Sequence, residues 1–137
     1  HAVGVVPGDF RMGNLMTDAQ GLKLVLDWEV AHLGDPAQDI AWVCLRTWRF
    51  GGAKPVAGVG EREELFRAYE AAGGPKVDRE AVFFWEAFGN LKWGVMAVRK
   101  GHKFRDGGEP SLEECAVGRR MEEPLWDFFQ VLQEGGH

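Results

Sequence analysis

Residues 7–14 read Pro-Gly-Asp-Phe-Arg-Met-Gly-Asn, and this stretch decides how the rest of the chain is interpreted. It places Asp9 and Asn14 five positions apart, directly after the short apolar run 3–6. Asp27 follows thirteen positions after Asn14, at the end of a later apolar run. We expect one tight loop to hold Asp9 and Asn14, and a hairpin after that loop to bring Asp27 back beside them.

This set of side chains matches what phosphoryl transfer requires. A carboxylate orients and deprotonates the acceptor hydroxyl, and a metal ion neutralises charge on the moving phosphate. Mg²⁺ prefers oxygen ligands and usually keeps waters and substrate phosphates in its coordination shell. One Asp base, one Asn carbonyl and one Asp carboxylate are therefore a sufficient protein contribution. Each residue alone is also a common turn residue, so the prediction depends on the combination.

The first third of the chain is strand and turn in character. Short apolar runs stand at 3–6, 15–16 and 22–26, and the polar turn 17–21 separates the last two. This pattern predicts a small hairpin made of 15–16 and 22–26. So few short strands do not form a stable sheet by themselves. We expect them to lie on helices or against something that this chain lacks.

The remainder of the chain is predicted to be helical. Asp35 precedes Pro36, which is a strong start signal with Asp35 as the N-cap and structural support of the helix. This helix is expected to run to about Arg49, and Gly51-Gly52 would end it. A second helix is expected over 61–72.

Two further helices are expected, one beginning after Asp78 and one at the capping box of Ser111 and Glu114. The charged segment 101–108 is predicted to be a loop between them, and Pro124 to kink or break the last helix. Both helices carry apolar side chains at helical spacing, which we expect to be buried. These are Phe84, Phe88, Leu91, Val95 and Val98, and then Cys115, Gly118, Met121, Leu125, Phe128 and Leu132.

Length and composition limit the class of protein. The 137 residues fit a single domain, and 45% of them are hydrophobic, which is enough to form a core. A net charge of −5 with scattered Lys and Arg argues against nucleic-acid binding. The chain has no apolar run of about 18 residues and no signal peptide, so we expect a cytoplasmic protein without membrane contact. The fold class predicted is α+β and mostly α-helical.

These motifs resemble the aminoglycoside phosphotransferase family of kinase-like enzymes, whose loop reads His-Gly-Asp-x-x-x-x-Asn. The resemblance is closest to the branch that occurs in bacteria and, in animals, fused to acyl-CoA dehydrogenases. That branch is similar to this chain at residues 8–15, 26–29, 34–42, 88–95 and 118–120, and so over nearly its whole length. The resemblance implies that residues 1–137 form the C-terminal, catalytic lobe of a protein-kinase-like fold, with the hairpin at the catalytic loop.

The resemblance also implies a role for each site residue. Asp9 would be the catalytic base. Asn14 and Asp27 would hold Mg²⁺ and, through it, ATP as the phosphoryl donor, with Glu29 as a secondary metal or water ligand. Asp39 would brace the catalytic loop from the helix that follows. The substrate implied is a small molecule with a hydroxyl group, and the family name does not specify an antibiotic.

The chain departs from the family pattern in two ways. Pro7 stands where the family has His, and no segment corresponds to the N-terminal, ATP-binding lobe with its Gly-rich loop. These departures motivate an alternative function, a non-catalytic kinase-like remnant or interaction module. They also predict an exposed apolar surface that the missing lobe, or a second copy of the chain, would cover.

A third alternative is a metal-dependent phosphohydrolase. Asp9, Asp27, Asp35 and Asp39 are four carboxylates that could together form a two-metal site. This alternative ranks last, because the predicted N-cap role of Asp35 removes one of the four ligands.

Overall fold

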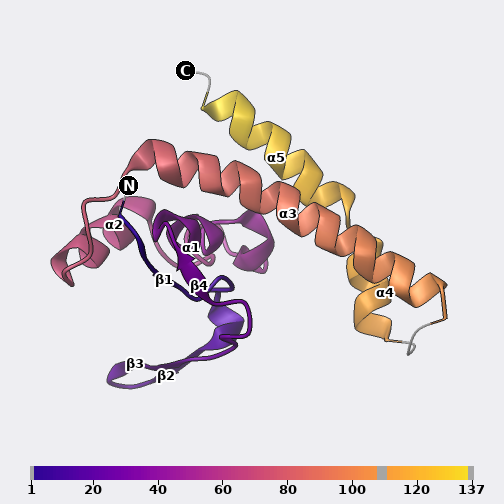
Figure 1. Ribbon diagram of the computed structural model, residues 1–137, viewed down its shortest axis with the longest axis horizontal. Helices are drawn as coiled ribbons and strands as arrows, with labels where there is room; N and C mark the ends of the chain where they lie inside the picture. Colours follow the sequence, from indigo (N-terminus) through magenta and orange to yellow (C-terminus); the bar gives the residue numbers. More distant parts are fainter. Residues whose placement is uncertain (1, 108–110, 136–137) are drawn as a thin grey trace. The chain divides into compact units, whose positions relative to one another are not determined.

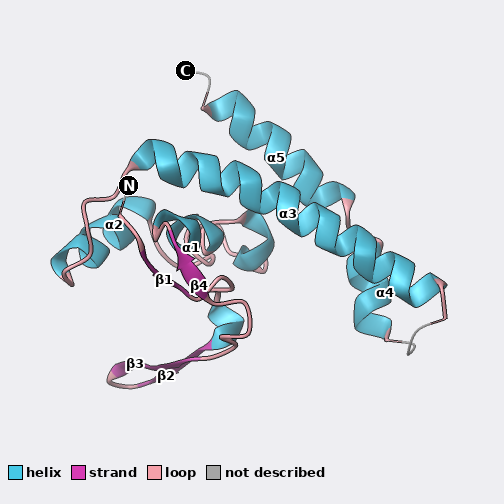
Figure 2. Cartoon of the chain, in the orientation of Figure 1, coloured by secondary structure: helices cyan, strands magenta, loops and turns pink. Residues whose placement is uncertain are grey.

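The computed structural model describes residues 2–107 and 111–135. The chain forms two compact units, residues 1–86 and 87–137, and helix α3 (Arg79–Arg105) runs from the first into the second. Strands occur only in the first unit among the described residues, and helices make up most of the ordered structure (Figure 2). The predicted α+β, mostly helical class is confirmed.

The strands of the first unit form two separate antiparallel pairs. β2 (Leu15–Asp18) and β3 (Gly21–Val25) form the predicted hairpin, which is prominent at the lower left of Figure 1. β1 (Gly4–Val6) pairs with β4 (His32–Gly34), a strand that the sequence analysis did not predict. A three-residue strand carries too little pattern to be recognised. β4 forms because it pairs with β1, and the paired residues Val5 and Leu33 lie 28 positions apart in the sequence.

The pairing of β1 with β4 positions the loop that contains Asp9. The loop begins where β1 ends, and α1 (Ala37–Trp42) begins shortly after β4. Antiparallel pairing of the two strands therefore brings the loop beside the start of α1. Val6, the last residue of β1, is fully buried and anchors this junction.

Helix α1 is much shorter than predicted. It ends at Trp42, and a short 3-10 helix, η2 (Arg46–Arg49), follows in place of the predicted continuation. Leu45 has an extended ψ of 138° and is fully buried, so the chain leaves the helical path to place this side chain in the core. The Val43 carbonyl accepts the N–H of Ala57, a residue outside the helix, at 3.0 Å.

The core of the first unit lies where α1, α2 (Arg62–Ala71) and the first turns of α3 meet. Ala37, Ile40 and Ala41 of α1 pack with Phe66 of α2 and Val82 of α3. The three residues of α1 recur at helical spacing, so they lie on one face of the helix. The core holds α1 in a fixed place, and α1 in turn supports the Asp9 loop.

The starts of three helices agree with the sequence analysis, whereas α1 begins at Ala37, one residue later than predicted, with Pro36 in the N-cap position. Glu61 and Glu64 form a reciprocal capping box at the start of α2, and the Asp78 carboxylate accepts the Glu80 and Ala81 N–H groups at the start of α3. The Ser111 hydroxyl accepts the Glu114 N–H at the start of α4 (Leu112–Gly118). The break expected near Pro124 is also present, since α4 ends at Gly118 and α5 spans Glu122–Glu134.

The loop predicted at 101–108 is wrong over most of its length, because α3 continues through Gly101 to Arg105. Residues 108–110 lie outside the described part of the chain. A side chain at Gly101 would place its Cβ 3.2 Å from the Gly118 Cα of α4. Gly101 therefore lets two helix backbones meet within the second unit, and it does not end the helix.

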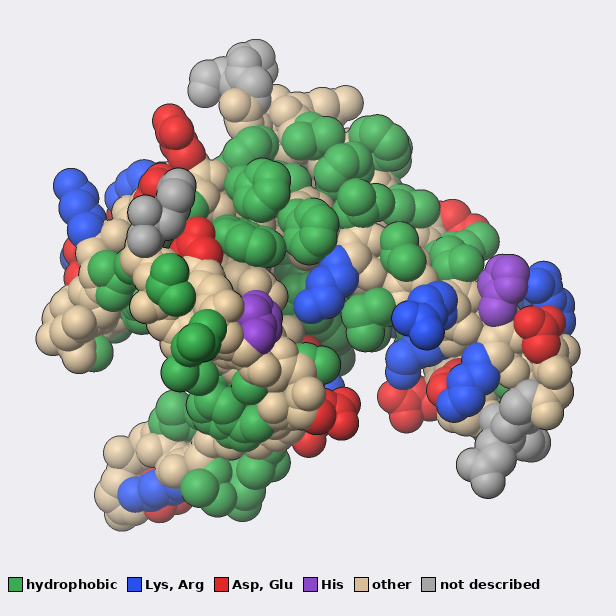
Figure 3. All heavy atoms as spheres, viewed as in Figure 1, with side chains coloured by type: hydrophobic (Ala, Val, Ile, Leu, Met, Phe, Trp, Pro, Cys, Tyr) green, Lys and Arg blue, Asp and Glu red, His purple; other side chains and the backbone are tan. Residues whose placement is uncertain are grey.

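The prediction that the apolar stripe of α3 is buried is also wrong. Phe84, Phe88, Leu91 and Val95 are between 38% and 57% exposed. Hydrophobic side chains are visible over much of the molecular face in Figure 3. Among the described residues, none of the helices combines the length and apolar character needed to cross a bilayer.

Candidate active site

The loop between β1 and β2 turns sharply at Gly8. Gly8 has a φ of +84°, a left-handed conformation that only glycine adopts without strain. Its buried N–H donates to both carboxylate oxygens of Asp39, at 3.1 and 3.3 Å. Asp39 is itself only 9% exposed and belongs to α1. This is the contact that a bracing role for Asp39 requires, and it forms one residue after Pro7.

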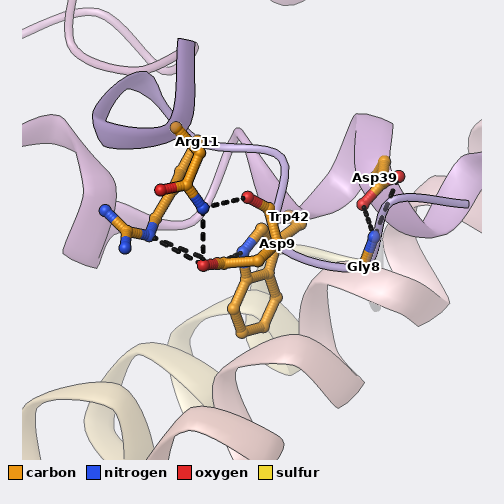
Figure 4. Close-up of polar contacts among 6 residues, drawn as sticks. Gly8, Asp9, Arg11, Asp39 and Trp42 are labelled. Carbon is orange, nitrogen blue, oxygen red and sulfur yellow. Dashed lines mark hydrogen bonds and ion pairs between the residues drawn. The ribbon is translucent and has the colours of Figure 1, made fainter. Parts of the chain in front are cut away.

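The Asp9 carboxylate lies at the centre of a dense set of hydrogen bonds (Figure 4). Oδ1 accepts the indole N–H of Trp42 at 2.8 Å, and Oδ2 accepts the amide N–H of Asn14 at 2.8 Å. The Nε–H of Arg11 is shared between the two oxygens, at 3.2 and 3.1 Å. Asp9 is therefore held in one orientation by donors from its own loop and from α1.

Asn14 is brought to Asp9 as predicted from their spacing. Its side chain is 3% exposed, and its amide nitrogen donates to the Asp9 backbone carbonyl at 2.9 Å as well as to the Asp9 carboxylate. Because the nitrogen faces Asp9, the amide oxygen is the atom left to contact a ligand. The Leu26 N–H donates to the Asn14 carbonyl at 2.8 Å and ties the end of the hairpin to the loop.

Asp27 and Glu29 follow that connection and are exposed. Asp27 has a φ of +57°, which is unusual for a residue with a side chain. Within the described part of the chain, neither carboxylate makes a hydrogen bond or ion pair. The hairpin brings Leu26, the residue before Asp27, into a backbone hydrogen bond with Asn14. No hydrogen bond joins Asp27 itself to Asp9 or Asn14.

The donor atoms of this region suit Mg²⁺. The Asn14 amide oxygen and the Asp27 carboxylate are hard oxygen ligands, and the Asp27 carboxylate makes no hydrogen bond or ion pair within residues 2–107 and 111–135. The unusual backbone of Asp27 is the kind of local strain that accumulates at ligand sites. Asn14 and Asp27 therefore fit a cation, with Glu29 two residues further along the same turn.

The structure does not gather the carboxylates that a two-metal hydrolase needs. Asp35 accepts the Ala37 N–H at 2.9 Å and the Trp85 indole N–H at 3.0 Å, so it supports the start of α1 and links it to α3. Asp39 is bonded to Gly8. The described residues contain no group of three or more His, Cys, Asp or Glu side chains that could hold a metal ion.

The sequence analysis did not single out two residues that contact Asp9, Arg11 and Trp42. Arg11 lies two positions after Asp9, and its guanidinium stacks 5.1 Å from the Trp48 ring centroid. Trp42 lies three positions after Asp39, so both face the loop from one side of α1. That spacing is a signal that could have identified Trp42 once Asp39 was placed against the loop.

Comparison with known proteins assigns this chain to a family. Residues 2–81, more than half of the chain, match the phosphotransferase enzyme family. The chain is 30% identical to mouse acyl-CoA dehydrogenase family member 10, over 95% of its own length and 14% of that protein. It is 25% identical to a crystal structure from Ralstonia eutropha described as a candidate aminoglycoside phosphotransferase. The TM-score is 0.70, with 92% of this chain and 42% of that chain covered. The chain belongs to the phosphotransferase enzyme family.

Proposed function

We propose that this chain is the catalytic part of an ATP- and Mg²⁺-dependent phosphotransferase that acts on a small-molecule hydroxyl group. The observation that carries the proposal is the Asp9 carboxylate, which Trp42, Arg11 and Asn14 hold in one orientation. A base must be fixed within hydrogen-bond reach of the proton that it accepts. The hydrogen bonds from these three residues give the Asp9 carboxylate the fixed orientation that a base needs.

In this mechanism Asp9 orients the acceptor hydroxyl and takes its proton as the phosphoryl group moves. Trp42 and Asn14 keep the carboxylate in place, and the Asp39 carboxylate holds the turn at Gly8. Asn14 and Asp27 are the residues that would hold Mg²⁺, with Glu29 as a further ligand. Bound Mg²⁺ supplies charge neutralisation on the phosphates of ATP.

Substitution of Asp9 tests the proposal in the full-length protein. Asp9→Asn keeps the size of the side chain and one acceptor oxygen but removes its negative charge and its basicity. We expect it to lower the formation of ADP from Mg-ATP, measured with a panel of small hydroxyl compounds, by about 100-fold or more. Asp18→Asn, at an exposed turn of the β2–β3 hairpin, is the matched control and should leave the rate unchanged. Undiminished turnover in the Asp9 variant would refute the assignment.

A non-catalytic remnant is the second candidate, and Pro7 is the observation that favours it. Proline lacks the side-chain hydrogen bond that the family's His would offer at this position. The Asp39–Gly8 contact nevertheless forms, which supports a competent loop. Calorimetric titration of Mg-ATP into the full-length protein separates the two. Binding that the Asp27→Ala variant weakens favours the enzyme, and absence of binding favours the remnant.

We also propose that another polypeptide segment covers the exposed apolar side chains of β1 and β4. Val5 and Leu33 face each other across this pair and are 65% and 75% exposed. The chain spans 42% of the Ralstonia protein, so an ATP-binding lobe is one candidate cover, and a second copy is the other. Light scattering distinguishes them, because a chain that stays monomeric at high concentration excludes the second copy. Use of ATP and Mg²⁺ agrees with a cytoplasmic location.

A further inference from the structure

Helices α3 and α4 border a cavity within the second unit, which we call the α3–α4 cavity. It has a volume of about 240 Å³ and is lined by nine described residues between Val98 and Met121. Gly101 and Gly118 lie where the two helix backbones meet, because a Cβ at Gly101 would be 3.2 Å from the Gly118 Cα. This contact holds the helices side by side, so the walls of the cavity come from both. None of the lining residues belongs to the site around Asp9.

The walls of the α3–α4 cavity are mostly apolar. Val98 and Phe104 come from α3, and Met121 follows the end of α4. Burial of apolar ligand surface against such side chains is favourable. The volume of about 240 Å³ is below the range of roughly 300–1,000 Å³ that is usual for pockets holding drug-sized compounds. The cavity therefore suits a small ligand with an apolar body.

The polar side chains of the cavity offer donors. They belong to His102, Arg105 and Arg119, and none of the nine described lining residues carries a carboxylate, an amide or a hydroxyl side chain. Arg105 Nη2 lies 3.0 Å from His102 Nδ1. A guanidinium cannot accept a hydrogen bond, so Nδ1 accepts and the ring proton is on Nε2, which is a further donor. A ligand that pairs with this set must supply acceptors, and an anion does so with the strongest hydrogen bonds.

Arg119 and Arg105 have guanidinium groups that a ligand can reach. Arg119 is exposed and makes no hydrogen bond or ion pair within the described part of the chain. Its neighbour Arg120, in contrast, donates twice to the Glu123 carboxylate, at 2.7 and 2.8 Å. Arg105 is also exposed, and its contact with a carboxylate is a long one, 3.5 Å from Nε to Asp106. Two positive charges at the cavity are thus available to an anionic ligand.

We propose that the α3–α4 cavity binds a small organic anion whose charged head group pairs with Arg105 and Arg119 and whose apolar body lies against the walls. Arginine suits this role because its planar group pairs with a carboxylate through two parallel hydrogen bonds. The site selects for charge and for an apolar body together. It goes beyond the proposed function, since none of its residues takes part in phosphoryl transfer at Asp9.

Cys115 lines the cavity and provides the measurement. A bound ligand shields its thiol from iodoacetamide, an uncharged reagent. Cys44 is fully buried, so alkylation of the folded full-length protein reports Cys115, and mass spectrometry of the labelled peptides separates the two. The probe is octanoate at about 2 mM, which should slow labelling of Cys115 about threefold if its dissociation constant is about 1 mM. Octan-1-ol, octylammonium and acetate at the same concentration should leave the rate unchanged.

Two variants and a matched control test the guanidinium groups. Arg119→Gln and Arg105→Gln each remove one positive charge, and each should reduce the ratio of the labelling rates without and with octanoate. Arg120→Gln removes a neighbouring charge that does not line the cavity, and it should keep the threefold ratio. Slow labelling of Cys44 shows that each variant is folded.

Three results would overturn the proposal. Labelling that octanoate does not slow would show that the cavity stays empty. Equal protection by octan-1-ol or by acetate would show that only one half of the ligand is recognised. Full protection in both the Arg119 and the Arg105 variants would show that their guanidinium groups do not hold the head group. The assay measures no phosphoryl transfer, so each of these results leaves the proposed function as it stands.

Discussion

Asp39 accepts the Gly8 N–H with both oxygens of its carboxylate, at 3.1 and 3.3 Å, from a helix 31 positions further along the chain. This bond joins the two structural features on which the site depends. Gly8 directs the loop toward Asp9, and α1 supplies both Asp39 and the Trp42 indole that contacts Asp9. The helix therefore fixes the loop at one point and the Asp9 carboxylate at another.

Removal of the Asp39 carboxylate should destabilise the protein. Asp39→Ala leaves the buried Gly8 N–H without this acceptor, which costs about 1–3 kcal/mol of unfolding free energy. Asp39→Asn keeps one acceptor oxygen and should cost less. Urea denaturation measures both. Asp18→Ala removes an exposed carboxylate that accepts the Gln20 N–H, and it should change stability by less than about 0.5 kcal/mol. Equal effects at positions 18 and 39 would contradict a special role for the buried contact.

Gly8→Ala should be more harmful than the same substitution at another left-handed glycine. A Cβ at Gly8 would lie 2.9 Å from the Val30 carbonyl oxygen, in addition to the strain of a positive φ. Gly21 has a φ of +114° and open space around it, so Gly21→Ala isolates the backbone strain, at about 1–2 kcal/mol. We expect Gly8→Ala to cost about 1–3 kcal/mol more, measured by chemical denaturation. Equal losses of unfolding free energy in the two variants would show that the structure around Val30 relaxes to accept the added Cβ.

Two tryptophans donate to carboxylates and allow a matched comparison. Trp42→Phe removes the donor to Asp9 and should lower kcat about tenfold, which corresponds to the loss of one hydrogen bond that orients the base. Trp85→Phe removes the donor to Asp35, a carboxylate that supports the start of α1 and links it to α3. It should lower thermal stability by about 1 kcal/mol and leave kcat unchanged. The opposite pattern, with kcat sensitive at Trp85 alone, would show that the site has been placed wrongly.

The two cysteines should differ in reactivity. Burial raises the pKa of the Cys44 thiol from its ordinary value of 9.0 to about 11. The thiolate fraction at pH 8 therefore falls by about 100-fold, and alkylation by iodoacetamide slows accordingly. Cys115→Ser isolates Cys44, and the same variant in urea gives the unfolded reference rate. Labelling that is equally fast in both conditions would contradict the burial of Cys44.

The same shift makes stability depend on pH. Between about pH 9 and pH 11 the unfolded chain loses the Cys44 proton while the folded chain keeps it. The folded state then binds more protons, so unfolding free energy falls as the pH rises through this range. Cys44→Ala should flatten that slope in denaturation curves recorded at successive pH values.

Much of the site was predictable from sequence because its parts are close along the chain. Asp9 and Asn14 share one loop, and the bond between them spans five positions. Arg11 stands in the same loop, but nothing in its residue type indicates that its guanidinium donates to the Asp9 carboxylate. Trp42 lies 33 positions from Asp9, and only the docking of α1 against the loop brings the two together.

The fold divides in the same way. The sequence by itself determined the β2–β3 hairpin and the starts of α2, α3 and α4, because a turn or a cap depends on residues within three or four positions of one another. Only the tertiary structure decided where α1 ends, since Leu45 leaves the helix to enter the core. It also decided the pairing of β4 with β1 and the continuation of α3 past Gly101. These features depend on partners that are distant in sequence, and local patterns carry no information about distant partners.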